Sequence, residues 1–212
     1  MSPRPNVEEE RRRQILEAAC EAIAERGFAA VRISDVAAKA NTSTGTVHYY
    51  FENRQDVLRK ALRFAFEQSL SRQLAELARL RSPRRRLLRL IELNLPGAGE
   101  VGAGEATEEW IVWMEFWLEA VHHPEMRPVN EELYGRWRKV VADIIVAGQA
   151  AGDFRQDADP DSLANRFVAL MDGLAIQVLL HSPQMTAGKM RRVLADFVTS
   201  DLSEAVIAIP GS

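Results

Sequence analysis

The chain has 212 residues, of which 47% are hydrophobic and 27% charged, a composition typical of a globular protein with a sizeable core. Its formal net charge of −3 excludes a nucleic-acid-binding protein whose whole surface is basic. Its single cysteine, Cys20, excludes an intramolecular disulfide and a cysteine metal cluster. Because no apolar stretch reaches the ~20 residues that span a bilayer and no signal-peptide core is present, we expect a cytoplasmic protein without membrane contact.

The N-terminal part is expected to be a mobile arm, Met1 to Glu9, followed by a helix that begins at Arg11 and ends at Gly27. Cys20 shares the apolar face of this helix, so we interpret it as a small core residue. Up to Arg63 the chain carries 11 basic and 9 acidic residues, against 16 and 21 in the remainder. Positive charge is therefore slightly concentrated near the N-terminus.

Two short helices, 34–40 and 44–50, are predicted next, separated by Asn41-Thr42-Ser43. A long helix is then expected from Asn53 to about Leu80, because apolar residues recur along it at helical spacing. Ser82 and Pro83 are typical of a helix start, and this next helix is expected to end near Leu95.

The glycine-rich segment 96–104 lacks the Lys-Ser/Thr pair of a phosphate-binding loop and is expected to be a flexible connection. Four further helices are predicted at 107–122, at 124–151, at 160–180 after the cap Asp159, and at 187–204 after the cap Thr186. No convincing strand pattern and no fixed repeat occur. We therefore predict an all-α fold of about nine helices, with an N-terminal domain at 1–52 and a second domain at 53–212.

Residues 27–58 read GFAAVRISDVAAKANTSTGTVHYYFENRQDVL, and this segment resembles the helix-turn-helix domain of the TetR family. The segments EEWIVWMEFWLEA, ELYGRWRKV, GQAAGDFR and MDGL resemble the choline-responsive, BetI-like subclass. Four positions depart from the family pattern. Thr42 stands where an aliphatic residue is common, and His48 stands where tyrosine is common. Asn41 replaces a glycine of the turn, which asparagine tolerates because it adopts positive φ readily, and Arg32 stands where threonine often caps the second helix.

Candidate DNA contacts follow from the expected packing of a helix-turn-helix. Small residues on the second helix permit a close crossing, so the third helix projects with its N-terminal side chains toward base edges. We expect Thr44, Thr46 and Tyr49 to contact bases, and His48 and Tyr50 to contact phosphates, with core packing as the alternative for Tyr50. The remaining candidates hold the phosphate backbone or shape the helix start: Arg32, Ser34, Lys39, Ser43, Gly45 and Arg54. Arg11, Arg12 and Arg13 either add phosphate contacts or form a solvated face.

The second part of the chain is rich in aromatic residues. The resemblance implies an effector cavity, for which the candidates are Phe66, Trp110, Trp113, Phe116, Trp117, Tyr134 and Trp137. Core packing is the alternative for the whole set. Glu109, Glu115 and Glu119 on the same predicted helix favour a cationic effector. Glu119 and His123 lie one turn apart, but two ligands without a third do not indicate a metal, so we expect no metal and no cofactor.

The last two long helices carry apolar faces that need a partner. The resemblance implies a two-fold dimer, with interface candidates Leu163, Phe167, Leu170, Leu174, Val178, Val193, Leu194 and Phe197. Gly173 is expected to permit close helix approach.

The predicted function is a homodimeric repressor that binds a palindromic operator in double-stranded DNA and is released by a small-molecule effector. The alternative is a helical small-molecule-binding oligomer without DNA function. An enzyme is disfavoured, because no nucleophile–base pair or carboxylate dyad occurs at a workable spacing.

Overall fold

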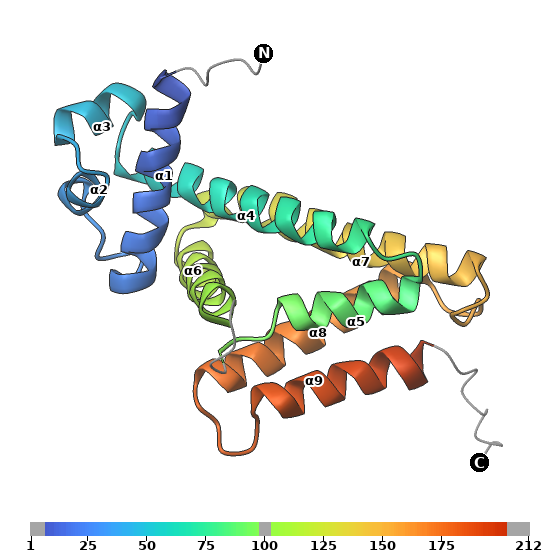
Figure 1. The fold of residues 1–212 in the computed structure, drawn as a ribbon. Coiled ribbons are helices and arrows are strands. Elements are labelled where there is room, and N and C mark those ends of the chain that lie inside the picture. Colours follow the sequence, from blue (N-terminus) through green and yellow to red (C-terminus); the bar gives the residue numbers. More distant parts are fainter. Residues whose placement is uncertain (1–6, 98–102, 203–212) are drawn as a thin grey trace. The chain divides into compact units, whose positions relative to one another are not determined.

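The computed structural model describes residues 7–97 and 103–202, which form nine α-helices and no strand (Figure 1). The predicted all-α fold is therefore confirmed. The α-helices are α1 Val7–Arg26, α2 Ile33–Lys39, α3 Thr44–Tyr50, α4 Arg54–Ala78, α5 Pro83–Leu93, α6 Ala103–His122, α7 Arg127–Ala150, α8 Pro160–Leu179 and α9 Ala187–Asp196. A 3-10 turn, Pro124–Met126, precedes α7, and a π-helical turn, Phe197–Asp201, follows α9.

The described residues divide into two compact units. The first unit comprises the chain up to Leu70 together with Glu108–Asn130, and the second unit comprises Ser71–Thr107 and the chain from Glu131. The division expected after residue 52 lies inside the first unit, because most of α4 and α6 packs with α1–α3 in one core.

Four helices begin at the capping residues that the sequence predicts. In each case the side-chain oxygen of the cap accepts a backbone N–H of the first turn, which that turn leaves without a helical partner. The oxygen–nitrogen distances are 3.0 Å at Ser43, 3.4 Å at Ser82, 2.8 Å at Asp159 and 3.2 Å at Thr186.

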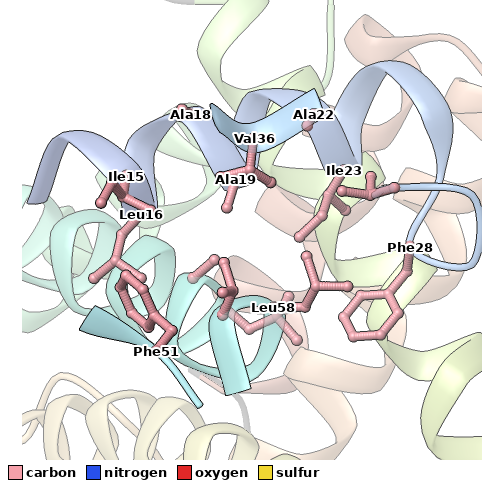
Figure 2. Close-up of a cluster of buried hydrophobic side chains, with 14 of the residues drawn as sticks. Ile15, Leu16, Ala18, Ala19, Ala22, Ile23, Phe28, Val36, Phe51 and Leu58 are labelled. Atoms are coloured by element: carbon pink, nitrogen blue, oxygen red, sulfur yellow. The ribbon is translucent and has the colours of Figure 1, made fainter. Parts of the chain in front are cut away.

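The first unit has a continuous apolar core. Figure 2 shows Ile15, Leu16 and Ile23 of α1 pointing toward Phe51 and Leu58. The same core includes Val112, Phe116 and Ala120 of α6, so the helix-turn-helix and α6 are parts of one folded body. Cys20 packs against this core with its thiol 3.3 Å from the Ala61 carbonyl oxygen, and burial raises the pKa of the thiol to about 12. The thiol is therefore protonated at neutral pH, as expected of a packing residue.

In the second unit α8 packs against α9, and α5 also contacts α9 (Figure 1). The core contains Leu163, Phe167 and Met171 of α8 with Met190 and Leu194 of α9, all at most 2% exposed. Among the described residues, α8 alone is long and apolar enough to cross a membrane by length and composition. Core helices of globular proteins pass the same test, and the buried residues of α8 have that role here.

Several helix boundaries differ from expectation, for example the start of α6 at Ala103 rather than at residue 107. α1 begins at Val7 rather than Arg11, since Glu8–Glu10 place negative charge in its first turn, where the helix dipole favours it. The helix expected at 187–204 ends at Asp196 and continues as the π-helical turn. Of the glycine-rich segment, residues 98–102 lie outside the described residues, as do residues 1–6 of the expected arm.

Candidate nucleic-acid interface

The turn between α2 and α3 has a defined hydrogen-bond pattern. Asn41 adopts a φ of +47°, which confirms that asparagine takes the left-handed conformation expected at this position. The N–H of Asn41 donates to the Ala38 oxygen at 3.2 Å, and the N–H of Thr42 donates to the Ala37 oxygen at 2.9 Å. This double closure, a Schellman motif, ends α2 sharply and fixes the direction in which α3 starts.

One residue anchors α3 while the rest of the helix remains accessible. Val47 is fully buried in the core of the first unit, and no other residue of α3 is buried. Thr44, Gly45, His48 and Tyr49 are exposed, the Tyr49 side chain by 75%. Because no acidic residue occurs from Asn41 to Phe51, the exposed face of α3 carries no charge that would repel phosphate.

Ser43 and Thr46 form one local pair at the start of α3. The Ser43 hydroxyl accepts the Thr46 N–H and also lies 2.9 Å from the Thr46 hydroxyl oxygen. Thr46 is half-buried, so this pairing orients its side chain, and Thr44 and His48 are the more accessible candidates for base contact. Tyr50 is also half-buried, with its ring packed edge-on against Tyr49 at 5.0 Å between ring centroids.

The N-cap residue of α2 is Arg32, where threonine is common in the family that the sequence resembles. The Asp35 carboxylate accepts the backbone N–H of Arg32 at 2.8 Å, so the cap interaction comes from the third helical residue instead of from residue 32. Arg32 and Ser34 are exposed, as phosphate contacts require.

Lys39 is tied to α1 in this structure. Its ammonium lies 2.7 Å from a Glu25 carboxylate oxygen and 3.5 Å from one of Glu21. The hydrogen bond to Glu25 raises the pKa of Lys39, so the side chain stays cationic. Lys39 reaches a phosphate only by leaving these two partners.

Arg54, a predicted DNA contact, has a structural role within the first unit. Its Nε donates to the Val31 oxygen at 2.6 Å, and its Nη2 donates to the Ala29 oxygen at 3.0 Å and to the Phe28 oxygen. A guanidinium has five N–H donors, and three of them hold backbone carbonyls here. We therefore assign Arg54 to holding the turn between α1 and α2 rather than to phosphate binding.

Arg11, Arg12 and Arg13 are part of α1. Arg13 pairs with Glu10 and Glu17 on the same helix. The Arg12 guanidinium lies 5.7 Å from the centre of the Phe51 ring, a cation–π distance. Both residues are exposed and act on their own unit in this structure.

Five of the seven predicted effector residues lie in the first unit, on α4 and α6. Trp113 is 5.9 Å from Phe66, 5.9 Å from Phe116 and 6.0 Å from Trp117 between ring centroids, and Trp110 is 6.4 Å from Trp117. We call these five residues the aromatic cluster. Phe66, Trp110 and Phe116 are buried, whereas Trp113 and Trp117 are half-buried.

Two carboxylates beside the aromatic cluster are bound to protein groups. Glu109 accepts a hydrogen bond from the Ser69 hydroxyl at 2.8 Å, and Glu115 accepts one from the Phe28 N–H at 2.7 Å. Glu119 lies 3.5 Å from His123, but the described residues contain no group of three ligands that could hold a metal ion.

The two remaining effector candidates, Tyr134 and Trp137, lie on the part of α7 that belongs to the second unit. Tyr134 donates its hydroxyl hydrogen to the carboxylate of Asp172 on α8. Burial raises the pKa of Asp172 to about 6, and the Tyr134 hydrogen bond only partly offsets this. Burial and the bond to Asp172 raise the pKa of the Tyr134 hydroxyl.

Most of the predicted dimer residues are buried within the chain itself. Leu163, Phe167, Leu174, Leu194 and Phe197 are at most 6% exposed, because α8 and α9 pack their most apolar faces on each other. These five belong to the core of the second unit rather than to a surface. Leu170, Val178 and Val193 remain half-buried, and Gly173 is exposed with no atom within 4 Å of a Cβ built on it.

The sequence did not indicate the roles of Arg54 and Glu115 in the turn between α1 and α2. Glu115 and Phe28 are 87 residues apart, and no local pattern reports such a contact. A polar contact at Asp172 was weakly indicated, because this acidic residue interrupts the apolar run of α8.

Two family descriptions match the chain. Residues 15–61 match the family described as bacterial regulatory proteins of the tetR family, and residues 83–203 match the C-terminal domain of BetI-type transcriptional repressors.

Similar proteins agree with this match. A putative transcriptional regulator from Saccharomonospora viridis, solved in complex with choline, is 41% identical with a TM-score of 0.82, over 93% of this chain and 100% of that chain. The regulator PksA of Bacillus subtilis is 27% identical over 93% of each chain, and the regulator BetI of Ectopseudomonas mendocina is 25% identical over 96% of this chain and 99% of its own length.

Proposed function

Since this chain belongs to the TetR family of bacterial transcriptional regulators, with a DNA-binding part and a BetI-type ligand-binding part, we propose that it is a homodimeric repressor. It binds a palindromic operator and is released by a small cationic effector. The observation that carries the proposal is the exposed, acid-free face of α3, which has one buried anchor, Val47. The protein acts in the cytoplasm, where bacterial DNA lies.

Base contact falls to Thr44, His48 and Tyr49, because these side chains are exposed on α3. Arg32 and Ser34 at the start of α2 contact phosphates and set the position of α3 in the major groove. Each base contact contributes about 1–3 kcal/mol of discrimination, so replacing one of these residues by alanine weakens operator binding by roughly 10-fold or more.

Mobility-shift titrations with the DNA upstream of the chain's own gene test this assignment. Thr44→Ala, His48→Ala and Tyr49→Ala are expected to weaken binding, while His122→Ala, at an exposed position outside the helix-turn-helix, leaves it unchanged. Equal affinity for all four variants contradicts the site assignment. A wild-type chain that binds no promoter DNA but does bind ligand supports the alternative of a small-molecule-binding oligomer.

The effector is a quaternary ammonium compound of the choline type. Two observations support this class: the aromatic cluster offers electron-rich ring faces on α4 and α6, and the 41% identical relative was solved with choline. Titration with choline is expected to change the tryptophan emission and to release DNA. The uncharged analogue 3,3-dimethyl-1-butanol is the matched control, because it keeps the shape and lacks the charge that cation–π binding needs. Equal responses to both compounds contradict a cation site.

The homodimer uses the exposed side of α8, on which Gly173 leaves open space, and Leu180, the C-cap residue directly after α8, is 69% exposed. A two-fold dimer places its two recognition helices about 34–36 Å apart, one turn of DNA. Gly173→Arg fills the open space without disturbing the chain's own core, so it is expected to convert the dimer to a folded monomer in sedimentation experiments. A dimer of unchanged stability in this variant places the interface elsewhere.

A further inference from the structure

The turn between α1 and α2, residues 27–31, is held from two directions by charged side chains. Glu115 of α6 accepts the N–H of Phe28 at 2.7 Å, and Arg54 of α4 donates to the carbonyl oxygen of the same residue. The Phe28 ring is 1% exposed and lies in the apolar core shown in Figure 2. Both ends of the Phe28 backbone are therefore fixed by helices that lie far from it in sequence.

The Glu115 contact depends on a close approach that only glycine permits. A Cβ at Gly27 would lie 2.9 Å from a Glu115 carboxylate oxygen and 3.3 Å from its carboxyl carbon. Gly27 also has a φ of +77°, which side chains rarely adopt. Gly27 thus ends α1 and also leaves room for the carboxylate of α6.

Glu115 lies within the aromatic cluster along α6. Trp113 precedes it by two residues, and Phe116 and Trp117 follow directly. Because a helical turn moves as a rigid segment with fixed rise and rotation per residue, a shift or rotation of α6 at Trp113 also displaces the Glu115 carboxylate. The hydrogen bond is charge-assisted and directional, so such a displacement weakens it.

We propose that Glu115 is a positioning residue that transmits the state of the aromatic cluster to the helix-turn-helix. Its carboxylate holds the α1–α2 turn, and this turn leads directly into Arg32, the N-cap position of α2, whose N–H is hydrogen-bonded to Asp35 in the first turn of that helix. The inference rests on the proposed function, since it names the route by which the effector acts on the DNA-binding helices. By reciprocity, DNA bound at α3 changes the aromatic cluster through the same bond.

Amide hydrogen exchange of the full-length protein tests the link without DNA or effector. When Trp113→Phe, a conservative change in the aromatic cluster, is made in the otherwise wild-type protein, the Phe28 amide is expected to exchange about 10-fold faster. In a Glu115→Ala background this amide already exchanges rapidly, and Trp113→Phe then adds nothing. Glu115→Gln, which keeps an acceptor oxygen, restores part of both the protection and the response. A Phe28 amide that is insensitive to Trp113→Phe in the otherwise wild-type protein overturns the proposal, and so does an equal response with and without Glu115.

A second measurement connects this link to DNA. In a Trp137→Phe background all three remaining tryptophans lie on α6, and promoter DNA is expected to change their emission. Glu115→Ala is expected to bind the DNA roughly 10-fold more weakly and to lose most of the emission change. Glu108→Ala removes the same charge at an exposed position of α6 and is expected to behave like the parent. An emission change that survives in Glu115→Ala overturns the proposal. Absence of DNA binding in the parent overturns the proposed function instead, and the exchange experiment then still decides whether Glu115 links the two regions.

Discussion

In the first unit, charged side chains hold the backbone of a turn, whereas in the second unit a half-buried polar contact on α7 and α8 joins two side chains. Arg54 and Glu115 fix both ends of Phe28, directly before α2 and α3. Tyr134 and Asp172 instead link α7 to α8 of the second unit, and both residues are half-buried. A turn held by side chains of other helices can follow their movement, while a half-buried side-chain pair mainly fixes the register of two helices.

The largest expected effect tests the apolar character of the second unit. Phe167→Ala removes a fully buried ring of α8, so the free energy of unfolding is expected to fall by about 3–5 kcal/mol in urea titrations. Val146→Ala, on an α7 side chain that is 50% exposed, is the control and is expected to change it by less than about 0.5 kcal/mol. Similar losses for both variants contradict the assignment of Phe167 to the core.

Removal of Arg54 tests the turn in the first unit. Arg54→Ala leaves the carbonyls of Phe28, Ala29 and Val31 without this donor, so we expect a loss of about 2–3 kcal/mol in the same urea titrations. Arg54→Lys keeps the charge but not the planar fork and is expected to recover only part of the loss. Full recovery with lysine indicates that charge, rather than the three hydrogen bonds, holds the turn.

The pH dependence of the free energy of unfolding tests the Tyr134–Asp172 pair of the second unit. The folded state raises the pKa of Asp172 to about 6, above the unfolded value near 4, so it binds this proton more tightly. The destabilising effect of Asp172 is therefore absent below about pH 4, grows as the pH rises, and is complete above about pH 6, where it reaches roughly 2 kcal/mol.

Asp172→Asn is expected to remove this dependence and to stabilise the protein at pH 7. The measurement is the free energy of unfolding of variant and wild type between pH 4 and pH 7. Asp153→Asn, at an exposed position of the second unit, is the control and leaves the difference flat. A constant difference between Asp172→Asn and wild type contradicts the raised pKa.

The smallest expected effect concerns the turn between α2 and α3. Asn41→Gly relieves the left-handed conformation at a φ of +47° and is expected to change the thermal unfolding midpoint by only a few degrees, corresponding to less than about 1 kcal/mol. Asn41→Val is expected to lower stability by about 1–2 kcal/mol, because a β-branched side chain is strained there. Equal midpoints for glycine and valine contradict a left-handed residue 41.

Elements whose causes are local could be predicted from the sequence alone. The caps at Ser43, Ser82, Asp159 and Thr186 and the left-handed Asn41 each depend on residues within one helical turn, and all were predicted. The order of small and apolar residues in 27–58 likewise identified the helix-turn-helix.

Which faces of the helices meet could not be predicted and became apparent from the packing of the folded chain. The apolar residues of α8 and α9 were recognisable, but periodicity does not tell whether such a face meets another helix of the chain or a second copy, and five of the eight interface candidates are buried internally. The role of Arg54 in the turn and the contact of Glu115 with Phe28 were equally invisible, because they join residues that come together only when distant helices pack. Hydrogen bonds of this kind follow from the fold, since no local sequence pattern encodes a contact across 87 residues.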